Sequence, residues 1–168
     1  PEMKEPGKRE LPAVPAGNMQ KYENYKEQFK RLNRALANGF NLEAVFIEYA
    51  IIEDRTESIL RHAGAYAAYL KKRGRYSATI ESKVKYIVKL AENKSGLLHR
   101  YFSDSLLSDI LAWKDERNRL IHALLKQVLT TEELIELAQT GERLTKELRT
   151  RTNNYKRAVE RQPERANP

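Results

Sequence analysis

The chain has 168 residues, of which 40% are hydrophobic and 32% are charged, as is typical of one helical domain with exposed charged faces. It contains no cysteine and only three histidines, which excludes disulfides, thiolate catalysis and the usual cysteine-based zinc sites. Carboxylates remain an alternative set of ligands for a hard cation, but we expect any chemistry to need neither a metal nor a cofactor.

The net charge of +8 and the pI of about 9.6 favour an anionic partner, of which nucleic acid is the commonest. The alternative is a basic surface that binds nothing, because net charge alone does not identify chemistry. No apolar run is long enough to span a bilayer, and no secretory segment is present. We expect a cytoplasmic protein that does not engage membranes.

The first helix is expected after a proline-rich arm. Residues 1–17 hold four of the six prolines and lack periodicity, which predicts an extended segment. From Met19 to about Asn38, apolar residues recur at spacings of three and four, and Gly39 is well placed to end the helix.

A second helix is predicted from Asn41, whose side chain is a suitable cap. Its apolar stripe runs to Ala63, and the helix either kinks at Gly64 or restarts after it. Glu53 and Thr56 fall on the apolar side of this stripe. A carboxylate in such a position usually has a cationic partner.

A basic turn follows, in which cations surround Gly74 and tyrosines flank them. This composition suits single-stranded RNA, because cations meet phosphates and rings stack on bases. The alternative is a solvated helix end, since cations near a C-terminus complement the helix dipole. The candidate RNA-binding residues are Lys71, Lys72, Arg73, Arg75 and Tyr76, with Tyr69 on the other flank.

Three more helical segments and a short helical turn complete the pattern. Ser77 or Thr79 begins a helix that ends near Asn93, and residues 97–102 form the short turn, in which His99 is structural or on the surface. The next helix spans about 106–128.

Thr130 and Glu133 then form a capping box for a last helix to about Val159. The basic residues of its far half either extend a positive surface or keep the helix soluble: Arg149, Arg151, Lys156, Arg157 and Arg161. Residues 162–168 are expected to be a flexible tail. Without any strand pattern, the sequence predicts one all-α domain over residues 18–161, an up-and-down bundle of about four to five long helices.

Polar groups suited to phosphate chemistry occur within the helix over 106–128. On a helical wheel Arg117 lies in the middle of an apolar arc, where a guanidinium is costly unless it is paired or at an interface. Asn118 and His122 are four residues apart at the edge of the same arc. The arc consists of Ile110, Trp113, Leu120, Ile121, Leu124 and Val128.

The stretch Arg117-Asn118 followed by His122 and the small residue Ala123 resembles the R-x(4–6)-H motif of the HEPN superfamily of helical domains, many of which are ribonucleases. Arg55 and His62 also fit this spacing, but the second site has the fuller form. The resemblance implies a HEPN-like bundle that dimerises so that two copies of the motif face each other.

The activity implied is metal-independent cleavage of single-stranded RNA, in which the ribose 2′-hydroxyl attacks the adjacent phosphorus. The imidazole of His122 is a group that can accept a proton from the 2′-hydroxyl or give one to the leaving 5′-oxygen. Arg117 offers a planar fork to the phosphate, and Asn118 donates to the phosphate or fixes the imidazole. Glu53 is the candidate to orient Arg117, with an ion pair to Arg55 or Arg61 as the alternative. Arg119 is expected to contact phosphate generally.

Three interpretations of the chain stay open. The chain is either a catalytic homodimer, by family analogy a toxin or phage-defence effector, or a non-catalytic helical module that binds nucleic acid or protein. In a third possibility the protein pairs with a cognate antitoxin or nucleotidyltransferase, as many bacterial HEPN proteins do.

Overall fold

The computed structural model describes residues 18–74, 78–124, 126 and 130–165, and all regular secondary structure in these ranges is helical. The elements are α1 (Asn18–Ala37), α2 (Asn41–His62), α3 (Tyr66–Arg73), α4 (Ile80–Leu90), α5 (Leu97–Phe102), α6 (Leu106–Ala123), α7 (Thr131–Arg161) and the 3-10 turn η2 (Pro163–Arg165). The predicted all-α class is confirmed. The predicted arm over 1–17 lies outside the described residues.

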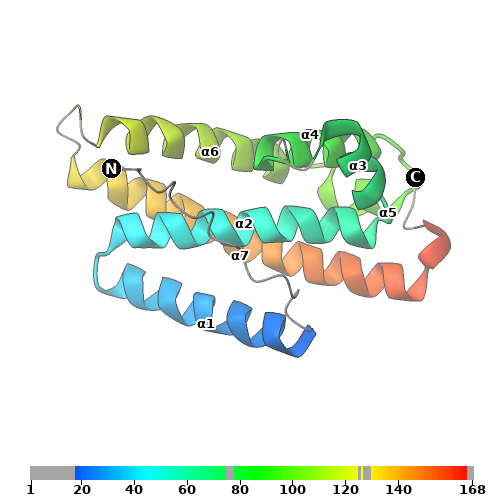
Figure 1. Cartoon of the computed structure of the whole chain (residues 1–168), viewed down its shortest axis with the longest axis horizontal. Coiled ribbons are helices and arrows are strands. Elements are labelled where there is room, and N and C mark those ends of the chain that lie inside the picture. The colour runs from blue at the N-terminus through cyan, green and yellow to red at the C-terminus, as the bar shows by residue number, and fades with distance from the viewer. Residues whose placement is uncertain (1–17, 75–77, 125, 127–129, 166–168) are drawn as a thin grey trace, which may run out of the picture.

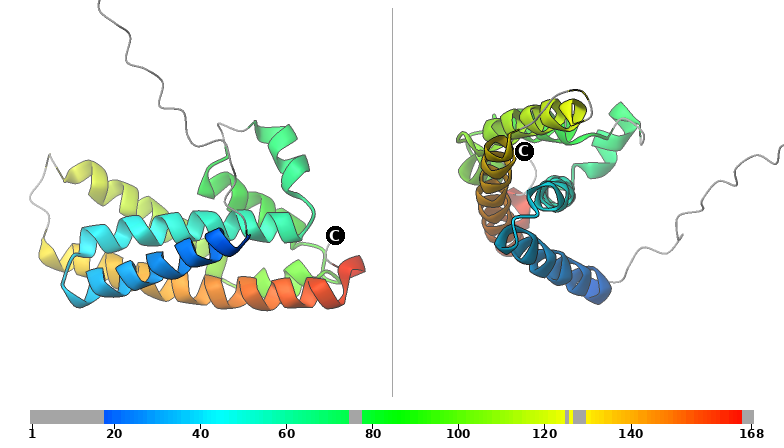
Figure 2. Two further views of the ribbon diagram at one scale, coloured as in Figure 1. Left: turned by 60° about the horizontal axis from the view of Figure 1, so that its bottom comes forward. Right: turned by 90° about the vertical axis from the view of Figure 1, so that its left-hand side faces the viewer.

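Long helices adjacent in the sequence run antiparallel, as in α1 with α2 and α6 with α7 (Figure 1). Viewed along the bundle, α2 lies near the centre, with α1, α7 and α6 around it (Figure 2). The principal contact in the bundle is between α2 and α7, and α7 also contacts α5 and α6. The core is therefore built on two helices that lie far apart in the sequence.

Most of the predicted helix ends are confirmed. Gly39 and Gly64 have φ angles of +72° and +67°, so the chain turns after α1 and α2 in a conformation that favours glycine. The helix consequently restarts after Gly64 instead of kinking there. Thr79 caps α4 by accepting from the backbone of Ser82, and Thr130 forms the predicted capping box with Glu133.

Two predicted boundaries differ from the structure. Asn41 is the first residue of α2 and not its cap, because Phe40 occupies the cap position without a side-chain hydrogen bond. Helix α6 ends at Ala123, earlier than the predicted end near Val128, which itself lies outside the described residues. The segment that was predicted to be a tail begins with η2, where Arg165 donates to the backbone carbonyl of Ser95 at 2.9 Å.

The inward faces of the helices follow the predicted stripes. From α7, Leu144, Leu148 and Tyr155 are fully buried against α2 and α5. On α6, Ile110, Trp113 and Leu120 are buried as predicted, and the Trp113 indole donates to the backbone carbonyl of Leu137 at 2.9 Å, which ties α6 to α7. None of the described helices is both long and apolar enough to cross a lipid bilayer.

Candidate functional site

Arg117 projects from α6 toward the first half of α2, where two aromatic rings receive it. The guanidinium carbon lies 4.5 Å from the centre of the Tyr49 ring and 5.1 Å from that of Phe46. Such cation–π contacts stabilise a partly desolvated guanidinium by about 0.5–2 kcal/mol. The arginine on the apolar arc of α6 is therefore accommodated by the aromatic residues of α2.

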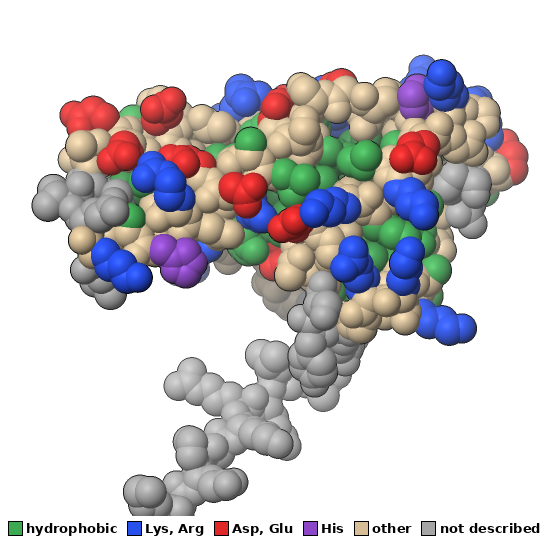
Figure 3. Space-filling model, turned by 90° about the horizontal axis from the view of Figure 1, so that it is seen from above, with side chains coloured by type: hydrophobic (Ala, Val, Ile, Leu, Met, Phe, Trp, Pro, Cys, Tyr) green, Lys and Arg blue, Asp and Glu red, His purple; other side chains and the backbone are tan. Residues whose placement is uncertain are grey.

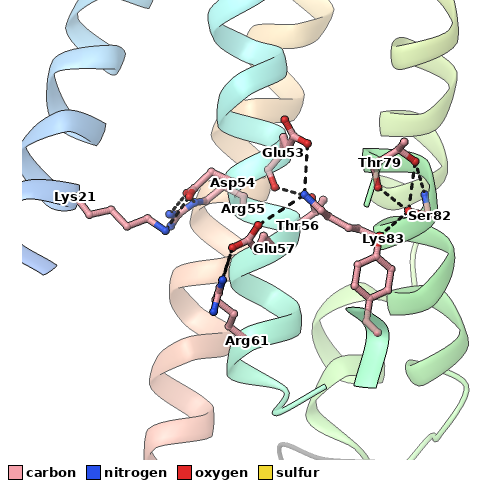
Figure 4. A network of polar contacts seen from close by, with 11 residues as sticks. Lys21, Glu53, Asp54, Arg55, Thr56, Glu57, Arg61, Thr79, Ser82 and Lys83 are labelled. Atoms are coloured by element: carbon pink, nitrogen blue, oxygen red, sulfur yellow. Dashed lines mark hydrogen bonds and ion pairs between the residues drawn. The ribbon is translucent and has the colours of Figure 1, made fainter. Parts of the chain in front are cut away.

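Glu53 does not orient Arg117, contrary to the expectation from the sequence. Its carboxylate pairs with the ammonium of Lys83 from α4 at 3.4 Å (Figure 4). Lys83 also lies 3.8 Å from the Glu57 carboxylate, and only 3% of its side chain is exposed. Glu53 lies one turn beyond Tyr49 along α2, where the neighbouring helix is α4, so the buried lysine is its partner.

Asn118 makes the direct polar contact to Arg117. One terminal nitrogen of the guanidinium donates to the Asn118 side-chain oxygen at 3.1 Å. The Nε of Arg117 is buried and has no hydrogen-bond partner, and Arg117 forms no ion pair with any described residue. By contrast, the nearly buried side chains of Lys83 and Lys114 each pair with carboxylates. Arg117 is thus a half-buried cation with hydrogen-bonding capacity that these neighbours leave unused.

His122 lies in the last turn of α6, four residues after Asn118, and is exposed. The structure joins Arg117 to Asn118, but among the described residues no hydrogen bond links either of them to the His122 imidazole. At about 100° per residue, Arg117 and His122 lie roughly 140° apart around α6. No hydrogen bond or ion pair to another described residue holds the exposed His122 ring in the free protein.

Arg119 is held by acidic neighbours. Its Nη2 lies 2.6 Å from a carboxylate oxygen of Glu116 and 3.3 Å from one of Glu133, the residue that closes the capping box of α7. The hydrogen bonds that Arg119 donates to Glu116 and then to Glu133 raise the pKa of Arg119 above its ordinary value. A phosphate would have to compete with two carboxylates for this side chain, so Arg119 joins α6 to α7 in the free protein.

The predicted basic turn is only partly described. Lys71, Lys72 and Arg73 are exposed at the end of α3 and form no ion pair with another described residue, whereas Arg75 and Tyr76 lie outside the described residues. Lys and Arg side chains gather over the α3 end of the face seen in Figure 3. Tyr69 is fully buried, and its hydroxyl lies 2.6 Å from that of Ser82. It therefore cannot stack on a base.

Glu48 is a fully buried ionisable residue that the sequence pattern did not reveal. It is fully buried between α2 and α7, neither carboxyl oxygen has a hydrogen-bond partner, and burial raises its pKa to about 9. The carboxyl lies against Gly141, at the point where a side chain on α7 would begin. Two signals in the sequence could have revealed it: Glu48 falls on the wheel among Val45, Ile51 and Ile52, and Gly141 interrupts a long helix.

Comparison with known proteins does not add an identification. No protein-family model matches the chain, and no match is found among curated proteins or solved structures. Among the described residues, no group of three or more histidine, aspartate or glutamate side chains is arranged to hold a metal ion. The geometry around Arg117 is therefore the basis for assigning a function.

Proposed function

We propose that the protein is a metal-independent endoribonuclease of the HEPN type that acts on single-stranded RNA. The observation that carries this proposal is the half-buried Arg117, which is fixed by two aromatic rings and Asn118 and lacks a carboxylate partner. A desolvated guanidinium without an acidic neighbour favours an anion, and a phosphate matches its planar fork.

The roles of the three residues follow from their chemistry. Arg117 holds the non-bridging oxygens of the phosphate and stabilises the charge that builds on them as the 2′-hydroxyl attacks. His122 takes the proton from this hydroxyl, and the bond from phosphorus to the 5′-oxygen breaks as that oxygen accepts a proton. The products are a 2′,3′-cyclic phosphate and a free 5′-hydroxyl. Asn118 keeps the guanidinium in register.

A homodimer would supply the second proton-transfer group. Phe46, which packs on Arg117, leaves 49% of its surface exposed, and Ile121 on the adjoining turn of α6 is only half-buried. A two-fold contact through this apolar rim would bring two copies of the motif together, with one His122 acting as base and its counterpart as acid.

A second candidate function is RNA binding without cleavage. It is favoured by Lys71, Lys72 and Arg73, which are exposed at the end of α3 and form no ion pairs within the part of the chain that the structure describes. Contacts of this kind supply affinity that falls steeply with salt, and they need no catalytic group.

Incubation of the purified protein with mixed single-stranded RNA in EDTA tests the proposal. We expect cleavage that leaves 2′,3′-cyclic phosphate ends and that is lost in a folded His122→Ala variant. His99→Ala is the matched control, because the His99 ring bonds to the Ala91 carbonyl at 2.8 Å and has a structural role. Salt-sensitive binding without cleavage by the parent would support the second candidate, and cleavage that survives His122→Ala would refute the proposed mechanism.

A further inference from the structure

A basic groove of about 550 Å³ lies at the other end of α2 from Arg117. It is formed by the start of α1, the last two turns of α2 and the far half of α7. The groove lies roughly 15 Å along α2 from the aromatic residues that contact Arg117, at about 1.5 Å per residue. The groove therefore shares no residue with the candidate ribonuclease site.

The lining of the groove contains no carboxylate. Five cationic side chains contribute to it, together with His62, and they come from three helices: Lys21, Arg55, Arg61, Arg149 and Lys156. The nearest acids already have partners, since Asp54 pairs with Lys21 at 2.8 Å and Glu57 with Arg61 at 2.7 Å. The lining residues themselves offer only cationic and neutral polar groups, although ion pairs with these acids offset the charges of Lys21, Arg55 and Arg61.

Two cations of the lining are available to a ligand. Arg149 forms no ion pair with any residue that the structure describes, and its guanidinium carbon lies 4.5 Å from the centre of the Phe29 ring. The Nζ of Lys156 lies 4.0 Å from the Oε1 of Glu160, which is a weak ion pair along α7. Burial, followed by the charge of Lys156, lowers the pKa of His62, which is consistent with a positive potential inside the groove.

Two buried hydroxyls in the lining have no hydrogen-bond partner. Thr152 on α7 is 1% exposed and its Oγ1 is unpaired, and the phenol oxygen of Tyr25 on α1 is likewise buried without a partner. Leaving a buried hydroxyl without a hydrogen-bond partner is costly. Both groups line a positive groove, so an anionic oxygen placed there would accept from them.

The shape and the remaining side chains favour an aromatic group beside the anion. The ring of Tyr22 is 59% exposed at the rim, and the exposed amide of Asn153 offers both a donor and an acceptor to the edge of a base. The volume lies in the range of about 300–1,000 Å³ that is typical of small-molecule sites. A phosphate alone would leave most of this space unfilled.

We propose that this groove binds a phosphorylated nucleoside, whose phosphate lies among Arg149, Lys156 and the hydroxyls of Tyr25 and Thr152 and whose base stacks on Tyr22. The nucleoside is either a free mononucleotide or one unit of an RNA strand, since both offer the same chemistry. The proposal is independent of the ribonuclease activity.

Calorimetry on the whole chain, with the four nucleoside monophosphates, adenosine, inorganic phosphate and a ten-residue RNA as probes, tests this site. We expect at least one monophosphate or the RNA to bind, and Arg149→Gln and Lys156→Gln each to weaken that binding about tenfold or more, as the loss of a charge-assisted hydrogen bond predicts. Arg143→Gln is the matched control, because Arg143 is exposed on the same helix outside the groove. Its affinity should stay within about twofold of the parent's.

Thr152→Val separates ligand binding from folding. The substitution removes an unpaired hydroxyl and keeps the shape, so the Tm should stay equal or rise while affinity falls about threefold to tenfold. Binding by the RNA alone that these substitutions weaken would assign the groove to a strand. Three results would overturn the proposal: no binding by any nucleotide or RNA, equal loss in Arg143→Gln, or inorganic phosphate binding as tightly as the nucleotides. His122→Ala should leave nucleotide binding in the groove unchanged. A failure of the nucleotide-binding proposal can therefore be distinguished from a failure of the ribonuclease proposal.

Discussion

The carboxyl group of Glu48 occupies the space in which a side chain at Gly141 would begin. An ideal Cβ on Gly141 would lie 2.0 Å from the Glu48 Oε2 and 2.9 Å from the Cζ2 of Trp113. The glycine in the middle of α7 thus creates room for a buried carboxyl from α2 and an indole from α6.

Gly141→Ala should destabilise the protein although alanine is the better helix former by about 1 kcal/mol. The added methyl group must displace two buried side chains, for which we expect a net loss of about 1–3 kcal/mol in the free energy of unfolding, measured by urea denaturation. In a Glu48→Ala background the loss should shrink but persist, because Trp113 still opposes the methyl group. Equal losses in both backgrounds would contradict the contact.

Glu48 should make stability depend on pH. Burial raises its pKa to about 9 in the folded state, against an ordinary value of 4.5, so folding favours the protonated form. The contribution of Glu48 to the free energy of unfolding is complete below about pH 4.5 and is lost progressively as the pH rises toward 9. Glu48→Gln should remove this dependence of stability on pH. At pH 7 it should raise the free energy of unfolding by at most about 3 kcal/mol, at about 1.4 kcal/mol per pH unit. Glu43→Gln, on the exposed side of α2, should leave the profile unchanged.

Replacing Arg117 by lysine should lower RNA cleavage by about a hundredfold while the protein remains folded. Lysine keeps the charge but loses the planar fork and the stacking on Tyr49 and Phe46. Cleavage rates at saturating RNA, beside circular dichroism spectra, measure this effect. Arg143→Lys is the matched control and should retain full activity. Activity of Arg117→Lys near that of the parent would remove Arg117 from the reaction.

Phe46→Lys should dissociate the proposed homodimer. It replaces an exposed apolar ring with a second cation beside Arg117, which disfavours a two-fold contact through this surface. Val88→Lys is a close match, since Val88 is 46% exposed but lies on α4. Light scattering coupled to gel filtration should show a dimer for the parent and for Val88→Lys. A monomeric parent, or an unchanged mass for Phe46→Lys, would exclude this interface.

The helices could be predicted because their boundaries have local chemical causes. Gly39, Gly64 and the pair of Thr130 with Glu133 act within a few residues, so spacing in the sequence was sufficient. The partner of Glu53 could not be predicted, because it depends on which helix faces each turn of α2. Lys83 lies thirty residues away and no periodicity identifies it. The basic groove could not be predicted for the same reason, since its cations come from three separate helices.

The pairing of α2 with α7 also bears on how the chain acquires its structure. The two helices are separated by almost seventy residues, yet each buries its inward face mainly on the other. Closing so long a loop precedes any gain from the contact, so this bundle should fold more slowly than helical bundles built on neighbours. During synthesis, α2 exposes Val45, Ile52 and Ile59 until α7 has been made, and a nascent chain in that interval is a natural substrate for chaperones.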